Sequence, residues 1–170
     1  MRKTLLTAIL LLIFVSGCST AKVEKTTWEA FPKLTFSELN TKLDAKGNFV
    51  AYFGWTKNCG DATNIQTNYF NAYLSEHPEW LDDTSSSFIY TVDLDAEIPV
   101  ALRLKPFRQP MTDMFSVAYS PTLIAYKDGI IIGKIEWTPL TSDPSTGIAK
   151  DVIDTFFANA VLGSFPVVTE

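Results

Sequence analysis

The chain has 170 residues, of which 46% are hydrophobic and 13% aromatic, and its 14 basic and 19 acidic side chains give a net charge of −5. This apolar content excludes a disordered chain, and the length suits one folded domain with a substantial core. The acidic balance argues against a nucleic-acid-binding protein, which would carry a basic face, so no nucleic-acid partner is expected.

The first 17 residues predict a secretion signal peptide. Arg2 and Lys3 precede a run of mostly Leu and Ile over residues 5–15, too short to span a bilayer as a helix. The run ends in Val-Ser-Gly-Cys at 15–18, which resembles the lipobox of bacterial lipoproteins, where the Cys is joined to diacylglycerol and becomes the first residue. The resemblance implies lipidation of Cys18; an ordinary cleaved signal with an incidental Cys is the alternative.

The signal implies a cell-envelope protein, lipid-anchored at the extracytoplasmic face of the membrane. Residues 19–27 are polar and lack apolar periodicity, so residues 18–30 are predicted to be the lipidated Cys and a flexible tether. Residues 31–170 are predicted to form the folded domain. Cleavage removes Arg2 and Lys3 and changes the charge to −7, so the lipid, not basic side chains, would hold the chain at the membrane.

The first half of the domain predicts the order helix, strand, helix, strand. Phe36, Leu39 and Leu43 have helical spacing, and Thr35 or Ser37 can provide the N-cap. The apolar run over 48–54 predicts a buried strand, followed by a helix over 59–76 that Pro78 stops and a second strand over 87–93. A strand–helix–strand unit predicts that the two strands are parallel.

The second half predicts a short helix, a β-hairpin and a last helix. The short helix covers 111–115, and the hairpin joins strands over 122–126 and 130–137 through Asp128-Gly129, a strong turn signal. The last helix is predicted over 147–162, with Ser145 or Thr146 as its cap. The whole order predicts an α/β fold in which a mixed central sheet has helices on both faces.

Two segments resemble the thioredoxin family. Phe-Ser-Val-Ala-Tyr-Ser-Pro-Thr-Leu at 115–123, followed by Tyr126 and Gly129, is similar to the family segment Tyr-Gly-Val-x-x-x-Pro-Thr-Leu. Trp-Thr-Lys-Asn-Cys-Gly-Asp-Ala at 55–62 is similar to the family motif Trp-Ala-x-Trp-Cys-Gly-Pro-Cys. The resemblance covers about residues 35–162 and implies a thioredoxin-like three-layer sandwich, nearest to extracytoplasmic proteins of the bacteriocin-accessory type.

The resemblance also implies a site. Pro121 should be cis, and Ser120 should offer its backbone to an extended polypeptide, a secreted or envelope partner. Cys59 is the candidate catalytic residue. The residues implied to bind a substrate are Trp55, Gly60, Ser120, Pro121 and Thr122.

The chain departs from the family at the second cysteine of the motif, where Ala62 stands. The acidic residue that many thioredoxins bury behind the dithiol would fall near Phe53, which is apolar. A second alignment, with Thr56 in the first Cys position and Cys59 in the second, is the alternative. A dithiol enzyme needs a second thiol to resolve its mixed disulfide, so this chain cannot complete that cycle by itself.

Three interpretations of Cys59 remain open. The domain could bind polypeptide without thiol chemistry, or Cys59 could perform monothiol exchange, helped by a helix start and by Lys57 but opposed by Asp61. Alternatively, Cys59 could be a buried and inert remnant. Residues 97–109, which carry three basic side chains and exceed the family spacing, could shape the groove.

The remaining polar residues predict no second site. His77 is expected to cap a helix or face solvent, and Asp93 and Asp95 are expected to be solvated. One His and one free Cys give no support for a zinc site, and no metal or cofactor is expected. Trp28, Trp80 and Trp137 are expected in the core or at its rim.

Overall fold

A computed structural model describes residues 27–99 and 113–162 of the chain. Its centre is a sheet of four strands in the order β2-β1-β3-β4. Strand β1 is parallel to β2, whereas β1–β3 and β3–β4 are antiparallel, so the predicted mixed sheet is confirmed. The strands are β1 (Phe49–Gly54), β2 (Ile89–Asp93), β3 (Thr122–Lys127) and β4 (Ile130–Glu136).

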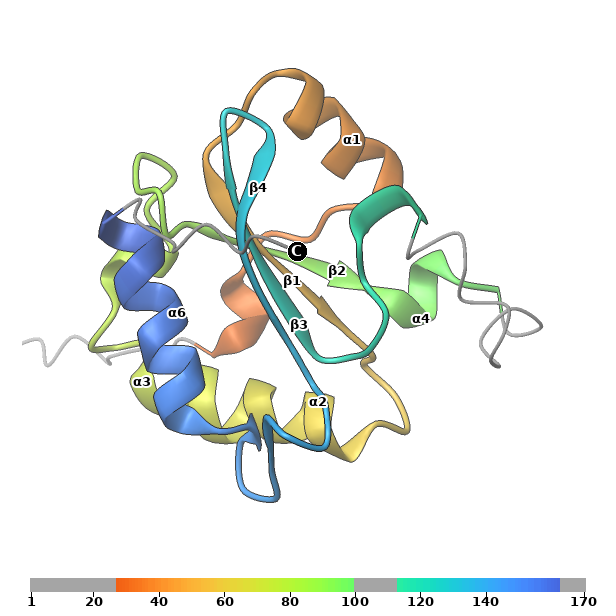
Figure 1. Cartoon of the computed structure of the whole chain (residues 1–170), viewed down its shortest axis with the longest axis vertical. Helices are drawn as coiled ribbons and strands as arrows, with labels where there is room; N and C mark the ends of the chain where they lie inside the picture. The colour runs from red at the N-terminus through yellow and green to blue at the C-terminus, as the bar shows by residue number, and fades with distance from the viewer. Residues whose placement is uncertain (1–26, 100–112, 163–170) are drawn as a thin grey trace, which may run out of the picture.

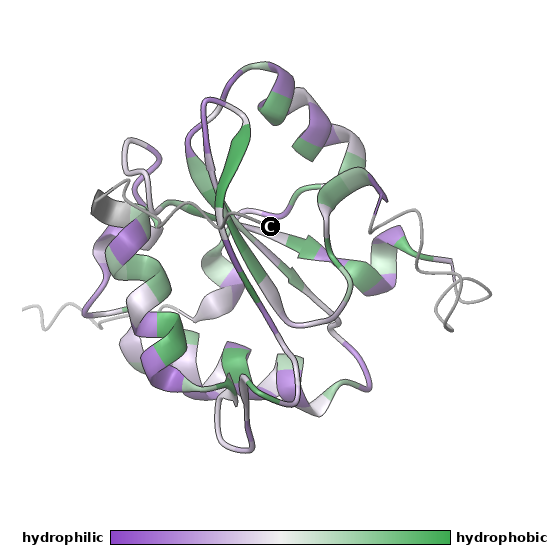
Figure 2. Cartoon of the chain, in the orientation of Figure 1, coloured by the Kyte–Doolittle hydropathy of each residue, from purple (hydrophilic) through white to green (hydrophobic). Residues whose placement is uncertain are grey.

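Helices cover both faces of the sheet, which confirms the predicted α/β sandwich (Figure 1). One face carries α1 (Phe36–Asp44) and α4 (Leu94–Glu97). The other carries α6 (Lys150–Leu162) and the helix that follows β1. Each face has its own apolar core because side chains alternate along a strand: Val50 and Tyr52 lie in one core, and Ala51 and Phe53 in the other. Hydrophobic residues follow the central strands (Figure 2).

The helix after β1 differs from the expected uniform α-helix. It consists of α2 (Gly60–Asn64), the π-helical segment η2 (Ile65–Phe70) and α3 (Asn71–Tyr73). Cys59 is the residue that caps its start, and the helix ends before the predicted Glu76. The inward residues include Gln66, which is 4% exposed and which apolar periodicity did not indicate because its side chain is polar.

The prediction for the start of the last helix is wrong. Helix α6 begins at Lys150, and Gly147–Ile148 form strand β6, which pairs with β5 (Ser142–Asp143) in a small hairpin. Ser145 and Thr146 do not cap the helix, because their backbone N–H groups donate to Asp143 Oδ1 at 2.7 and 3.0 Å. Gly147 leaves this turn with a φ of +77°, a left-handed value that suits glycine.

Other predicted turns and caps agree with the structure. Thr35 caps α1 in a capping box with Glu38, and the Asp128-Gly129 turn has positive φ at both residues. Two 3₁₀ helices flank the core that contains Val50 and Tyr52. They are η1 (Trp28–Ala30) and η3 (Pro78–Trp80), and Trp80 is fully buried. His77 stacks on Trp80 with ring centroids 4.4 Å apart, a contact that the sequence did not predict.

Several predictions lie partly or wholly outside the described residues. Cys18, the signal peptide and most of segment 97–109 belong to this group, as do Met111 and the start of the short helix, of which residues 113–115 are helical. Glu97 is described: it ends α4, and its Oε2 accepts a hydrogen bond from the Phe36 N–H at 2.9 Å. None of the helices in the described ranges has the length and apolar character needed to cross a lipid bilayer.

Candidate functional site

A hollow of about 290 Å³ opens where the β1–α2 connection, the segment before β3 and the end of β4 meet. Three residues implied by the resemblance, Trp55, Cys59 and Ser120, line it. Pro121 and Thr122 are buried beside it, and Gly60 is exposed at the start of α2. The full lining consists of Trp55, Asn58, Cys59, Asp61, Tyr119, Ser120 and Trp137.

Cys59 is half-buried, so its sulfur is neither fully enclosed nor fully exposed, and it is a free thiol. Its backbone is extended, with φ −130° and ψ 105°, and its carbonyl accepts hydrogen bonds from the N–H and the Oγ1 of Thr63 at 3.0 Å each. This position at the start of a helix agrees with the alignment that equates Cys59 with the first cysteine of the motif. Cys59 is therefore not fully buried, which differs from the burial that the third interpretation assumed.

Ala62, which the motif resemblance aligns with the second cysteine, is fully buried in the first turn of the helix. Its carbonyl oxygen accepts a hydrogen bond from the Tyr52 hydroxyl at 3.4 Å. The site therefore presents one thiol toward the hollow and a methyl group behind it. Within the described residues no second sulfur can resolve a disulfide formed on Cys59.

A buried polar pair lies behind the thiol, on the face opposite Phe53. Gln66 Nε2 donates to Tyr52 Oη at 3.1 Å and to the Trp55 carbonyl oxygen at 3.5 Å. Burial raises the pKa of Tyr52, and the charge of Cys59 raises it further, against the opposing effect of the Gln66 hydrogen bond. Tyr52 thus remains a neutral phenol at physiological pH and adds no negative charge behind Cys59.

The loop between β1 and the helix is held by carboxylates that the sequence analysis assigned to solvent. Asp95 Oδ2 accepts hydrogen bonds from the backbone N–H groups of Thr56 and Lys57 at 2.9 and 2.8 Å. Asp93 Oδ1 accepts from Thr56 Oγ1 at 3.0 Å and from the Asp95 N–H at 2.9 Å. The expectation of solvated carboxylates was wrong because the parallel pairing of β1 and β2 brings the ends of both strands together.

The Ser120-Pro121 peptide bond is cis, as the resemblance implied. Two hydrogen bonds fix this segment against its neighbours: the Trp55 N–H donates to Ser120 Oγ at 3.3 Å, and the Trp137 N–H donates to the Pro121 carbonyl oxygen at 2.9 Å. Thr122 Oγ1 donates to the Tyr119 carbonyl oxygen at 2.6 Å. Ser120 is thereby held next to Trp55 at the wall of the hollow.

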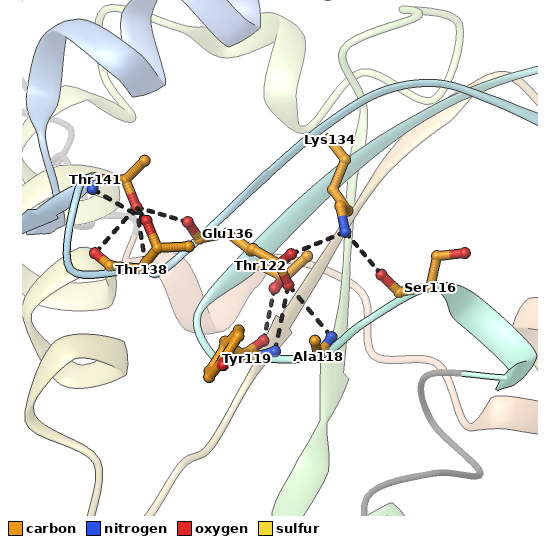
Figure 3. A network of polar contacts seen from close by, with 8 residues as sticks. All are labelled: Ser116, Ala118, Tyr119, Thr122, Lys134, Glu136, Thr138 and Thr141. Carbon is orange, nitrogen blue, oxygen red and sulfur yellow. Dashed lines mark hydrogen bonds and ion pairs between the residues drawn. The ribbon is translucent and has the colours of Figure 1, made fainter. Parts of the chain in front are cut away.

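Side chains of the edge strand β4 form hydrogen bonds with the backbone of residues 116–119, which precede Ser120 (Figure 3). Glu136 Oε2 accepts hydrogen bonds from the N–H groups of Ala118 and Tyr119, each at 3.3 Å. Lys134 Nζ donates to the Ser116 carbonyl oxygen at 3.1 Å and pairs with Glu136 Oε1 at 2.9 Å. This network orients the backbone that leads into Ser120, and the sequence pattern gave no indication of it.

The β5–β6 hairpin braces the helix that begins after Cys59. Asn64 Nδ2 donates to the Pro144 carbonyl oxygen at 2.8 Å, and Asn68 Nδ2 donates to the Ser145 carbonyl oxygen at 2.6 Å. A Cβ atom at Gly147 would lie 2.2 Å from the Asp61 carbonyl oxygen, so only glycine permits this approach. The hairpin lies directly against α2 (Figure 1).

The sequence analysis did not assign four lining residues to the binding site, Asn58, Asp61, Tyr119 and Trp137, although it placed Asp61 near the Cys59 thiol. Asp61 and Tyr119 stand within the two segments that carried the resemblance, so a position near the site could have been predicted for both. Trp137 follows β4 and reaches the site only through the pairing of β4 with β3, which no local pattern reports. In the described part of the chain, no group of three acidic, His or Cys side chains is arranged to bind a metal ion.

No protein-family model matches this chain, and no curated protein matches its sequence. Solved structures do match its fold. Mitochondrial thioredoxin 3 from Saccharomyces cerevisiae, in the oxidised form, is 18% identical with a TM-score of 0.50. A chain from a structural study of the thiol resolving mechanism in yeast mitochondrial 1-Cys peroxiredoxin is also 18% identical, with a TM-score of 0.51. Each match covers 79% of this chain and 99% of that chain, so the fold is thioredoxin-like.

Proposed function

We propose that the chain is a membrane-anchored, extracytoplasmic thioredoxin-like lipoprotein that binds an extended polypeptide along Ser120, beside Cys59. The observation that carries the proposal is the free backbone of Ser120. In the hydrogen-bond pattern of residues 27–99 and 113–162, neither the N–H nor the C=O of Ser120 has a partner. The residue is half-buried at the wall of the hollow, where such groups can pair with an added strand.

The absence of a thiol at position 62, next to Cys59 in the motif, favours binding over dithiol chemistry. Ala62 cannot form or resolve a disulfide, yet the carboxylates of Asp95 and Glu136 keep both walls of the hollow in order. Side-chain hydrogen bonds that hold a site without its reactive pair are consistent with a site retained for recognition. Trp55 and Gly60 belong to the same proposed binding surface, next to Pro121 and Thr122.

Strand addition at Ser120 can be tested directly. A blocked heptapeptide of alternating Thr and Val, with norleucine at its centre, is titrated into the domain while amide hydrogen exchange is followed by NMR. We expect exchange of the Ser120 N–H to slow at least about tenfold at saturation, because its hydrogen becomes bonded to the peptide. Slowing at the Ile131 N–H instead would identify the free edge of β4 as the binding strand and would refute the proposal.

Variants separate the two edges independently. Ser120→Pro removes the N–H donor and should weaken peptide binding, whereas Ile131→Thr on the β4 edge should leave the affinity unchanged. Circular dichroism and thermal unfolding confirm that both variants remain folded. Equal affinity of the Ser120→Pro variant and the unmodified domain would contradict backbone pairing at this residue.

A second candidate function is monothiol exchange, and the half-buried position of Cys59 in the hollow supports it. The Cys59 thiolate would attack a partner disulfide, forming one new S–S bond to Cys59 and releasing the partner's other sulfur as a thiolate. Because Ala62 offers no thiol, an external thiol would then have to attack the mixed disulfide and regenerate Cys59. The two candidates share one surface and differ in whether the sulfur reacts.

Thiol titration distinguishes them. If Cys59 only contributes to binding, its rate of reaction with a small disulfide should depend on pH in the same way as that of a cysteine in an unfolded peptide. A reaction that remains fast at pH 6 would indicate a stabilised thiolate and would favour exchange. Cys59→Ser provides the control: it should keep the peptide affinity if binding is the function, and lose all activity if exchange is.

The lipoprotein assignment and the bacteriocin-accessory type belong to this proposal as well. Their support is the sequence of residues 2–18, with its basic start, its apolar run and Cys18 at the end, and the resemblance over residues 35–162. A secreted or envelope polypeptide would then be the partner that meets the domain outside the membrane.

A further inference from the structure

The hollow beside Ser120 combines aromatic walls with one carboxylate. Trp55, Tyr119 and Trp137 supply the aromatic walls, and the ring centroids of Tyr119 and Trp137 are 6.2 Å apart at an angle of 53°. The polar lining comes from Asn58, Ser120 and the carboxylate of Asp61. Aromatic faces together with an acidic group are the surroundings in which proteins hold ammonium and guanidinium groups.

The Asp61 carboxylate is available for a cation. Across the residues that the structure describes, it has no hydrogen bond and no ion pair, and the residue is half-buried. The described lysines near the site do not pair with Asp61. Lys134 contacts Glu136 and Ser116 instead, and Lys57 is exposed and does not line the hollow. Among the residues that line the hollow, Asp61 is the one with a carboxylate.

We propose that this hollow receives a lysine or arginine side chain of the bound polypeptide, so that the partner is a basic segment. This inference rests on the proposed pairing at Ser120, because the Trp55 N–H bond to Ser120 Oγ holds the pairing residue at the rim of the hollow. A side chain of the paired peptide that points inward lies against the aromatic lining of the hollow, and its cationic end reaches Asp61. The acidic charge of the whole chain, −5, favours the approach of such a segment.

Heptapeptides that differ only in the central residue test the inference. Lysine, arginine, norleucine and glutamate are compared in the Thr/Val peptide, and dissociation constants are measured at 50 and 300 mM salt. We expect the lysine and arginine peptides to bind about tenfold more tightly than the norleucine peptide, and the glutamate peptide most weakly. The preference should decrease at the higher salt concentration, because part of it is an ion pair with a half-exposed carboxylate.

Three variants assign the preference to the hollow. Asp61→Asn and Trp137→Leu should each reduce the preference for lysine over norleucine, while the norleucine peptide keeps its affinity for Asp61→Asn. The matched control is Asp151→Asn, which removes an exposed carboxylate of α6 that does not line the hollow and should keep the full preference. A full preference retained in Asp61→Asn, or an equal loss in Asp151→Asn, would overturn the inference.

The two proposals fail in different ways. Equal binding of the lysine and norleucine peptides, with Ser120 protected in both, would refute the basic partner and leave the pairing at Ser120 standing. If no peptide of the series slows exchange at the Ser120 N–H, the pairing is refuted and the inference falls with it.

Discussion

At the scale of single residues, small side chains shape the site as much as reactive ones do. Tyr52 and Gly54 are two positions apart on β1 and therefore point to the same face. Because Gly54 has no side chain, the Tyr52 ring can lean over it, which brings the hydroxyl to Gln66 and to the Ala62 carbonyl oxygen. The hydrogen-bonded pair of Tyr52 and Gln66 thus depends on the absence of a Cβ atom at Gly54.

Replacing Gly54 by alanine tests this dependence. The new Cβ would lie 2.3 Å from Tyr52 Oη and would push against a fully buried ring, so we expect Gly54→Ala to reduce the free energy of unfolding by about 1–3 kcal/mol. Gly60→Ala is the matched control, since a Cβ there meets no atom within 4 Å and should be neutral or slightly stabilising. Urea unfolding measures both, and equal stability of the two variants would contradict the proposed clash.

At the scale of elements, polar side chains join segments that are far apart in sequence. Glu97, at the end of α4, accepts a hydrogen bond from the first residue of α1, Phe36. Thr35 and Glu38 close the same end of α1 with a capping box, in which Glu38 N–H donates to Thr35 Oγ1 at 3.2 Å. Hydrogen bonds from the Thr35 backbone and hydroxyl hold the pKa of Glu38 below its ordinary value of 4.5.

The capping box predicts an effect of mutation and of pH. We expect Thr35→Ala to lower the free energy of unfolding by about 1 kcal/mol at pH 7. Because the folded state lowers the pKa of Glu38, its contribution is complete above pH 4.5 and is lost as the pH falls through the lower folded value. Glu38→Gln should therefore lose less stability between pH 5 and about 3 than the unmodified domain.

Urea unfolding at several pH values checks these expectations. Thr41→Ala is the control: its hydroxyl donates to the Ser37 carbonyl oxygen within α1, away from the capped end, and its loss should change stability little. A Thr41→Ala effect as large as that of Thr35→Ala would show that the capping box has no special role.

At the scale of the whole molecule, the sheet separates two apolar cores, and the site lies where β1, β3 and β4 converge at one end. The described domain contains one free thiol and no disulfide. Buried aromatic residues stabilise it instead, and Trp80, for example, packs against Phe157 of α6 with ring centroids 4.8 Å apart.

The proposed lipid attachment at Cys18 predicts where the full chain is found. Expressed in a bacterium that processes lipoproteins, the unmodified chain should partition into the detergent phase, because two or more acyl chains contribute about 0.8 kcal/mol per buried methylene. Cys18→Ala should shift it to the aqueous phase, and Cys59→Ser should not. Mass spectrometry that finds Cys18 without lipid, or joined to Cys59 in a disulfide, would refute the anchor.

The sequence by itself predicted the order of the four main strands and of the longer helices, the parallel pairing of β1 with β2 and the hairpin turn at Asp128-Gly129. It also predicted the cis peptide bond before Pro121, through the resemblance, and the position of Cys59 at the start of a helix. These features follow from local patterns of apolar residues, turn residues and motifs, which neighbours in sequence largely fix.

Only the tertiary structure decided which polar residues serve the site. Four polar residues at the site are of types that are common on protein surfaces and in helices: Asp61, Gln66, Asp95 and Glu136. Hydrophobic periodicity carries no information about their partners. Sheet pairing brings Glu136 under the segment before Ser120, and helix packing turns Gln66 toward Tyr52. Such contacts join residues distant in sequence, so they exist only once the strands and helices have packed together.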